Sequence, residues 1–448
     1  MNVTIRRGSL NGTMTVPGSK SGTIRAVFLA LLSEGRSIIR NPLASGDGLS
    51  AKEAAIALGA TITEEGDRWI VEGVGRNLTH PSTSIDLGNS GTASSFLSSI
   101  ATLSGKPVTL TGDEQIRRRP FRTLFDALGD LGVDVLVHNP NRISPPVTIT
   151  GPLRGGSVTL QGFNSQFVSS LLLASPFAQR PVVITVRDGL EKPYVQLTLD
   201  WMKRFGIEVA NPDDYEYFEV PNTKTYRASE VAVGGDWSAL AFPLVASVLT
   251  PSELTIAGLD FSDSQGDKRV VDILQAMGAE IVRDPRSGTL SIRGGKRLGA
   301  LKEIDLADIP DALPALAVAA TQATGTTRFT NIAHVRVKET DRVLEMTERL
   351  NRLGCRLEIE EDELLVHGPT PIRGGTVSSA GDHRIAMAMV AAALVATGEV
   401  TVTEAECVDV SFPDFFKRFE ECGAKIARED EKAAYRNTPP ESRLSELN

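Results

Sequence analysis

The chain has 448 residues, 47 of them basic and 56 acidic, for a formal net charge of −9. At roughly 150 residues per domain, this length predicts two or three domains. With 41% hydrophobic residues, 40 Gly and 24 Pro, the composition is typical of an α/β or α+β protein and excludes collagen-like, disordered and disulfide-rich classes. The negative charge argues against general nucleic-acid binding, which depends on neutralising phosphates.

Cysteine usage and apolar runs indicate the compartment. The three cysteines, Cys355, Cys407 and Cys422, have no metal-ligand spacing, and so low a count fits a reducing compartment. The first residues contain no apolar stretch typical of a secretory signal. The longest apolar run, residues 385–396, is shorter than the roughly 20 residues that span a bilayer. We therefore expect a soluble, cytoplasmic protein without a membrane or nucleic-acid partner.

One signature recurs six times along the chain: an amphipathic helix, a large apolar residue or Cys, a glycine, and an alternating strand. A glycine suits the end of a helix because it adopts the left-handed conformation without strain. The pattern predicts six α/β units, three on each side of a boundary near residues 231–235. The highly charged end of the chain, from about residue 428, is predicted to be a flexible tail. The six glycines, about 70 residues apart, are Gly59, Gly132, Gly206, Gly278, Gly354 and Gly423.

Three segments in the first half combine turns, cations and helix starts. Residues 17–25 (PGSKSGTIR) and 87–92 (LGNSGT) each lead into a predicted helix. Backbone amides at a helix N-terminus attract anions, and Lys20 and Arg25 would strengthen that attraction. The first turn lacks the Walker spacing, and ordinary helix capping also explains both turns. Residues 117–122 (RRRPFR) place four arginines beside a helix start, which is unfavourable unless an anion lies nearby.

Three further motifs lie in the second half. Residues 308–311 (DIPD) precede an apolar helix, and residues 336–342 (RVKETDR) are predicted to open another, with Lys338 and Arg342 on one helical face. Residues 381–384 (GDHR) put three ionisable groups before a buried helix. Taken alone, each motif has an explanation that needs no ligand. Surface salt bridges explain the first two, and a structural histidine explains the third. Together the two halves predict a cleft for a small, multiply anionic ligand.

The motifs resemble those of the 5-enolpyruvylshikimate-3-phosphate synthase family over nearly the whole chain, to about residue 425. The resemblance implies an α/β (α+β) fold of two domains, each with three βαβαββ units, and an active site in the cleft between them. Domain 1 would hold residues 1–19 and 233–428, domain 2 residues 20–232, and residues 429–448 the charged tail. The matching segments are residues 17–21, 88–92, 119–120, 165–167, 308–311, 336–342 and 382–387.

The resemblance also implies a reaction and an acceptor site. The family transfers the enolpyruvyl group of phosphoenolpyruvate to the 5-hydroxyl of 3-phosphoshikimate, releasing phosphate, in aromatic amino acid biosynthesis. It acts as a monomer and uses neither metal nor organic cofactor. Ser21 and Arg25 would hold the carboxylate of the acceptor, while Ser165 and Gln166 would face its phosphorylated ring, with Tyr194 nearby.

The resemblance further assigns the groups that act in the transfer. Lys20 would touch both substrates. Asp311 and Lys338 would bracket the attacking hydroxyl, with Asp311 as proton acceptor, and Glu339 would serve proton transfer to the enol carbon. The residues expected to bind phosphoenolpyruvate are Gly91, Arg119, Arg342 and Arg384, and two histidines expected at the substrate site are His334 and His383.

Several positions depart from the family pattern. Ser95 and Val410 stand where the family has an arginine and a lysine that bind phosphoenolpyruvate. Glu191 and Asn164 replace serines that help to hold the acceptor's 3-phosphate, and His334 replaces an asparagine. Loss of a charge-assisted contact typically costs about 1.5–3 kcal/mol, so both phosphate sites are expected to be weakened. A further replacement is Ala239, in place of a serine.

Three interpretations stay open at this stage. The chain is a divergent 3-phosphoshikimate transferase, a paralogue acting on another or unphosphorylated shikimate-like acceptor (or eliminating water from it without phosphoenolpyruvate), or a binding protein with little catalysis. The retained Lys20, Asp311 and Glu339 argue against the third. The related reaction on UDP-N-acetylglucosamine is disfavoured because residues 112–116 lack that family's loop cysteine.

Overall fold

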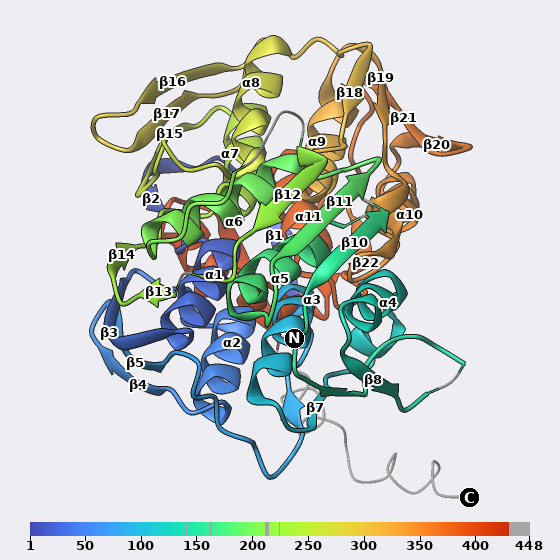
Figure 1. The fold of residues 1–448 in the computed structure, drawn as a ribbon. Helices are drawn as coiled ribbons and strands as arrows, with labels where there is room; N and C mark the ends of the chain where they lie inside the picture. Colours follow the sequence, from blue (N-terminus) through green and yellow to red (C-terminus); the bar gives the residue numbers. More distant parts are fainter. Residues whose placement is uncertain (140, 162–163, 211–214, 224, 430–448) are drawn as a thin grey trace, which may run out of the picture.

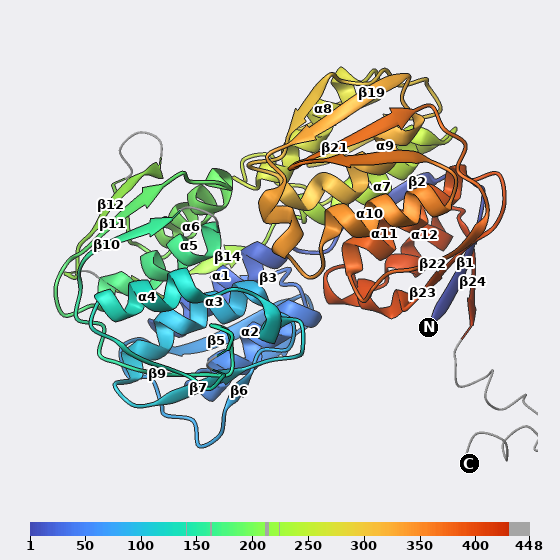
Figure 2. The same ribbon diagram turned by 90° about the vertical axis from the view of Figure 1, so that its right-hand side faces the viewer.

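The computed structural model describes residues 1–139, 141–161, 164–210, 215–223 and 225–429. They form two lobes that lie side by side (Figure 1, Figure 2). The core of lobe A is built within residues 24–233, and that of lobe B from residues 3–16 together with residues 237–424. The predicted tail lies, from residue 430 onward, outside the described residues.

The chain crosses twice between the lobes at one place. It leaves lobe B after β2 (Asn11–Thr15), builds lobe A, and returns at α7 (Trp237–Leu249). The two crossing segments pair with each other: Gly18 and Gly235 form an antiparallel bridge, and the Ser19 N–H donates to the Gly234 carbonyl at 2.8 Å. The domain boundaries at residues 19/20 and 232/233 stay a prediction, which the two separate cores support.

Each lobe carries three sheets in the described part of the chain, and each sheet joins parallel to antiparallel pairing. In lobe A the strand orders are β13–β3–β5–β4 (with β14 also on β3), β6–β7–β9–β8 and β10–β11–β12. In lobe B they are β16–β17–β15–β2, β18–β19–β21–β20 and β22–β23–β1–β24. This shared pattern supports the six-unit repeat, which stays a prediction. The six repeat glycines all have positive φ, from 84° to 110°.

The strands have the following bounds. In lobe A they are β3 (Ser33–Arg40), β4 (Thr61–Glu65), β5 (Arg68–Val74), β6 (Ile85–Asp86), β7 (Val108–Thr111), β8 (Asp134–Val137), β9 (Val147–Thr150), β10 (Gly156–Gln161), β11 (Val182–Arg187), β12 (Tyr217–Val220), β13 (Tyr226–Arg227) and β14 (Glu230–Ala232). In lobe B, besides β2, they are β1 (Asn2–Arg6), β15 (Glu253–Ala257), β16 (Glu280–Asp284), β17 (Thr289–Arg293), β18 (Glu303–Asp305), β19 (Gly325–Thr330), β20 (Arg356–Glu360), β21 (Glu363–Gly368), β22 (Gly375–Ser378), β23 (Val400–Thr403) and β24 (Lys425–Glu429).

Buried helices occupy the centre of each lobe, and the sheets lie outside them (Figure 2). α1 (Lys20–Leu31), α3 (Gly91–Ile100) and α5 (Ser165–Ala174) pack in lobe A, and α7, α9 (Leu313–Gln322) and α11 (His383–Val395) in lobe B. Their residues are small or apolar on nearly every side, as buried helices require. The remaining helices are α2 (Gly46–Ala57), α4 (Arg122–Asp130), α6 (Lys192–Arg204), α8 (Arg269–Ala276), α10 (Arg342–Arg352) and α12 (Phe415–Glu421).

The structure corrects one local prediction. Lys338 and Arg342 were expected one turn apart on a single helix, but a short 3₁₀ helix ends at Val337 and α10 begins only at Arg342. Asp341 explains the late start, because its side chain accepts a hydrogen bond from the Leu344 N–H at 3.0 Å and so caps the helix. Lys338 therefore lies between the two helices and belongs to neither, and its side chain reaches Glu191 of lobe A.

Candidate active site

A cleft between the lobes collects most of the residues predicted for the site. Lobe A contributes the N-termini of α1 and α5, and lobe B the turns before α9 and α10. Gly91 and His334 line a neighbouring side cavity instead, and Arg342, His383 and Arg384 line neither space. The predicted residues that line the cleft are Lys20, Ser21, Arg25, Arg119, Ser165, Gln166, Tyr194, Asp311, Lys338 and Glu339.

Lys20 is positioned where the chain crosses between the lobes. Ser19 caps α1 by accepting from the Gly22 N–H at 3.2 Å, and the Lys20 N–H donates to Asp236 Oδ2 at 2.8 Å. The Lys20 Nζ lies 3.3 Å from Asp47 Oδ2. Burial lowers the pKa of Lys20, but Asp47 and nearby carboxylates outweigh it, so the pKa is raised and the ammonium stays charged.

Arg25 lies one turn further along α1 and is buried. Its guanidinium donates to Thr198 Oγ1 at 2.9 Å and to the carbonyls of Ser21 and Tyr194 at 2.9 and 3.0 Å. Burial lowers its pKa to about 10. Within the described residues no carboxylate lies at ion-pair distance from Arg25, so its positive charge is available to an anion in the cleft.

Arg342 is the centre of a buried ion cluster. It is fully buried and contacts three carboxylates: Asp311 at 2.7 Å, Glu339 at 2.5 Å and Asp382 at 2.8 Å. Arg384 lies 3.0 Å from the second oxygen of Asp311. Burial alone would raise the pKa of Asp311 and Glu339, but the arginines and lysines around them hold both well below the usual range. Both carboxylates are therefore ionised.

Two ion pairs join the lobes across the cleft. Arg119 of lobe A lies 3.0 Å from Glu339, and Lys338 of lobe B lies 2.5 Å from Glu191. Glu191 also accepts from the hydroxyl of Ser165 at 2.6 Å. The sequence predicted that Glu191 would oppose a phosphate, and the structure adds that this carboxylate already has two partners.

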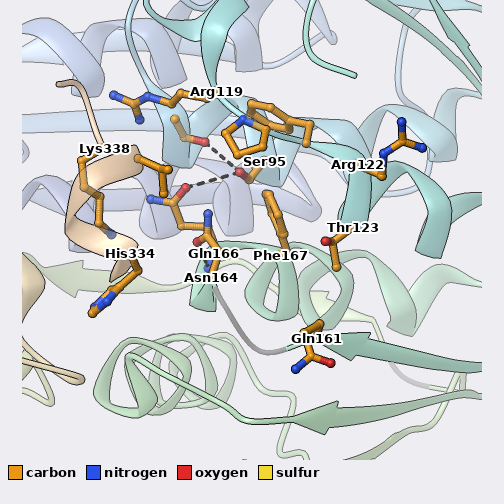
Figure 3. Close-up of a pocket in the computed structure, with 14 residues that line it drawn as sticks. Ser95, Arg119, Arg122, Thr123, Gln161, Asn164, Gln166, Phe167, His334 and Lys338 are labelled. Atoms are coloured by element: carbon orange, nitrogen blue, oxygen red, sulfur yellow. Dashed lines mark hydrogen bonds between the residues drawn. The ribbon is translucent and has the colours of Figure 1, made fainter. Parts of the chain in front are cut away.

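The side cavity opens beside the cleft and has a volume of about 260 Å³ (Figure 3). Phe167 and Phe121 form part of its wall, with ring centroids 5.8 Å apart. Ser95 also lines this cavity, and its hydroxyl donates to the Gly91 carbonyl at 2.8 Å, within its own helix. His334 is 2% exposed, neither ring nitrogen makes a hydrogen bond, and burial lowers its pKa. The ring is therefore neutral.

The other departures occupy distinct places. Asn164 caps α5 by accepting from the Gln166 N–H at 3.0 Å, as a serine could. Val410 ends a 3₁₀ helix of lobe B whose backbone abuts the start of α2: a Cβ on Gly46 would lie 2.3 Å from the Val410 carbonyl oxygen. Ala239 lies within α7 and is buried.

Neither Tyr194 nor His383 changes its protonation state near neutral pH. Tyr194 donates to Asp267, and burial together with that carboxylate raises its pKa well above the usual range. Burial lowers the pKa of His383 to about 3, with Lys20 also contributing, so the imidazole is neutral. Asp267 itself has a pKa raised to about 6, first by burial and then by Asp311.

Sequence reasoning missed three carboxylates that hold residues of the site in place. Asp47 pairs with Lys20, Asp236 receives its N–H, and Asp267 receives the Tyr194 hydroxyl. Asp236 follows a Gly-Gly pair at a helix start, a signal that capping rules could have read. Asp47 and Asp267 carry no local signal, since their partners lie in other elements.

Among the described residues, no group of three or more His, Cys, Asp or Glu side chains is arranged to hold a metal ion. In the same part of the chain, no helix is both long and apolar enough to cross a membrane.

Comparisons with known proteins agree on one family. The family model described as EPSP synthase (3-phosphoshikimate 1-carboxyvinyltransferase) matches residues 5–419. A 3-phosphoshikimate 1-carboxyvinyltransferase of Acetivibrio thermocellus is 39% identical over 95% of this chain and 99% of its own. The solved EPSP synthase of Acinetobacter baumannii has a TM-score of 0.80 at 26% identity, covering 95% of this chain and 100% of that one. An enolpyruvyl transferase of Streptomyces tendae, at 18% identity and a TM-score of 0.76 over 95% of this chain and 98% of that one, shares the fold.

Proposed function

This chain belongs to the EPSP synthase (3-phosphoshikimate 1-carboxyvinyltransferase) family, and on that premise we propose that it transfers the enolpyruvyl group of phosphoenolpyruvate to the 5-hydroxyl of 3-phosphoshikimate, releasing phosphate. One observation carries the proposal: cations, a pair of half-buried carboxylates and hydrogen-bonding groups from both lobes line one cleft. Such a cleft suits two small, multiply anionic substrates.

The chemistry assigns Asp311 and Glu339 separate tasks. Asp311 accepts the proton of the attacking hydroxyl, beside the Lys338 ammonium. Glu339 exchanges a proton with the enol carbon of phosphoenolpyruvate. Both line the cleft and both contact Arg342, which fixes their spacing. Closure of two lobes over the reactants also excludes water, which strengthens each charge interaction.

The remaining residues bind and orient. Ser21 and Arg25 hold the acceptor's carboxylate, and Ser165, Gln166 and Tyr194 its ring. Lys20 lies between the two substrates. Phosphoenolpyruvate contacts Arg119 in the cleft, and Arg342 and Arg384, buried behind Asp311, add positive charge that stabilises the phosphate as it leaves. His334 and His383, both neutral, are proposed to serve as hydrogen-bonding groups at the margin of the substrates.

The proposal requires one assay. Purified protein is mixed with phosphoenolpyruvate and 3-phosphoshikimate, phosphate release is followed, and the products are identified by mass spectrometry. We expect release that depends on 3-phosphoshikimate and yields its enolpyruvyl ether. Shikimate is the control acceptor. Absence of phosphate release with 3-phosphoshikimate would refute the proposed function.

Gly91 gives a prediction for the phosphoenolpyruvate side. A Cβ at this position would lie 2.1 Å from Arg119 Nη1, so Gly91→Ala must push the guanidinium away. We expect KM for phosphoenolpyruvate to rise by about tenfold, since a charge-assisted contact is lost, with KM for the acceptor unchanged. Stability should change little, because the displaced atom ends a flexible side chain. Steady-state kinetics measure both constants, and an unchanged KM for phosphoenolpyruvate would place its site away from Arg119.

A further inference from the structure

Glu191 is a buried carboxylate on which three hydrogen-bond donors converge. One oxygen accepts from the backbone N–H of Ser165 at 3.2 Å and from its hydroxyl at 2.6 Å. The other lies 2.5 Å from the ammonium of Lys338. A helix N-terminal amide, a hydroxyl and a lysine together are donors of the kind that bind a free oxyanion.

The backbone around Glu191 is held by both lobes. Its φ of 57° is left-handed, a conformation unfavourable for a residue with a Cβ, so contacts must maintain it. Its N–H donates to the Ala307 carbonyl at 3.0 Å, and the next N–H, of Lys192, donates to Asp308 Oδ1 at 3.1 Å. The side chain is only 4% exposed. The carboxylate therefore has a fixed position in the wall of the cleft.

The charge of Glu191 is also maintained. Burial raises its pKa, but the charge of Lys338, together with the hydrogen bonds from Lys338 and Ser165, outweighs burial, and the pKa is lowered overall. The positive charge of Lys338 is thus compensated within the protein. By contrast Arg25, on the same cleft, has no such carboxylate among the described residues. In the described part of the chain, the cleft therefore contains one cation without a carboxylate partner, Arg25, and one that is already paired, Lys338.

We propose that Glu191 is a specificity-determining residue that occupies the acceptor's phosphate site. The proposal rests on the proposed function, in which the acceptor's carboxylate goes to Arg25 and its phosphorylated ring to Ser165. A phosphorylated acceptor binds by taking the Ser165 and Lys338 donors from the carboxylate. An acceptor without the phosphate leaves the contacts of Glu191 in place.

The test removes the charge and keeps the shape. Glu191→Gln can still accept from Ser165 but no longer neutralises Lys338 or repels a phosphate. Isothermal titration calorimetry of the full chain with each acceptor gives Kd for 3-phosphoshikimate and for shikimate. We expect Kd for 3-phosphoshikimate to fall by about tenfold or more and Kd for shikimate to stay within about twofold. Glu230→Gln is the matched control, since Glu230 pairs with Arg40 outside the cleft and both Kd values should be unchanged.

Glu191→Ser provides a second variant in case the amide disturbs the fold, and it should show the same selective gain. An unchanged or higher Kd for 3-phosphoshikimate, equal tightening of both acceptors, or no binding of 3-phosphoshikimate by any of the proteins would overturn the proposal. Turnover is measured separately. A selective gain in binding without phosphate release in any protein would support the role of Glu191 and count against the proposed function.

Discussion

Asp311→Asn should lower kcat for the transfer from phosphoenolpyruvate to 3-phosphoshikimate by at least about 10³-fold. A positioned general base contributes typically about 10²–10⁴-fold, and an amide cannot take the proton of the hydroxyl. Asparagine keeps the size of the side chain and can still accept the hydrogen bond from Arg342, which now spans 2.7 Å. The loss is therefore expected in kcat, with KM changed much less.

The charges around Asp311 explain when it can act as a base. Burial raises its pKa, but Arg384, Arg342 and the two lysines hold it well below the usual range. A carboxylate of such low basicity accepts protons poorly. Two anionic substrates bring negative charge to the same arginines, which raises the pKa of Asp311 toward the range that base catalysis requires. We infer that substrate charge activates Asp311.

The measurement is steady-state phosphate release, with a fold control. Removing Asp311 leaves Arg384 without its carboxylate, so the unfolding midpoint should fall, but circular dichroism should show a folded protein at the assay temperature. Asp284→Asn is the matched control, since Asp284 is exposed and does not line the cleft, and it should retain full activity. A kcat for Asp311→Asn within tenfold of the unchanged protein would remove Asp311 from the role of base.

Local signals predicted the parts of this protein that depend on local geometry. Helix ends were predictable because Gly59 and its repeats need positive φ, and α1 and α3 begin where Ser19 and Ser90 cap them. The boundary at Arg342 was wrong because the charge spacing suggested a longer helix, whereas the Asp341 cap starts it later. Capping took precedence over side-chain pairing.

Partners from distant elements could not be predicted in the same way. The sequence indicated that Glu191 would oppose a phosphate, but not that Lys338, 147 positions away, would neutralise it. Nor does any local pattern place Asp47 beside Lys20. Such pairs follow from how elements distant in the sequence pack together, so the pairing of the charges in the cleft could be read only from the structure.

Arg342→Met should be the most destabilising single change in the ion cluster behind the cleft. It removes the cation that three carboxylates share and leaves Asp382, fully buried, without that partner. Removing one side of a buried ion pair costs about 3–5 kcal/mol. We expect the urea midpoint to fall accordingly and activity to disappear. Arg342→Lys is the control: one ammonium cannot reach all three carboxylates, so its loss of stability should be intermediate.

The dependence on pH separates this electrostatic cause from lost packing. In the unchanged protein the pKa values of Asp311, Glu339 and Asp382 are lowered, so their stabilisation is fully present above the unfolded pKa of about 4 and is lost as pH falls through the lower folded values. Without Arg342, burial raises those pKa values, and protonation then relieves the variant. The difference in unfolding free energy should therefore be largest near pH 7.5 and shrink toward about pH 5. An equal difference at both pH values would mean that Arg342 stabilises the fold by packing, because the loss of apolar contacts does not depend on protonation.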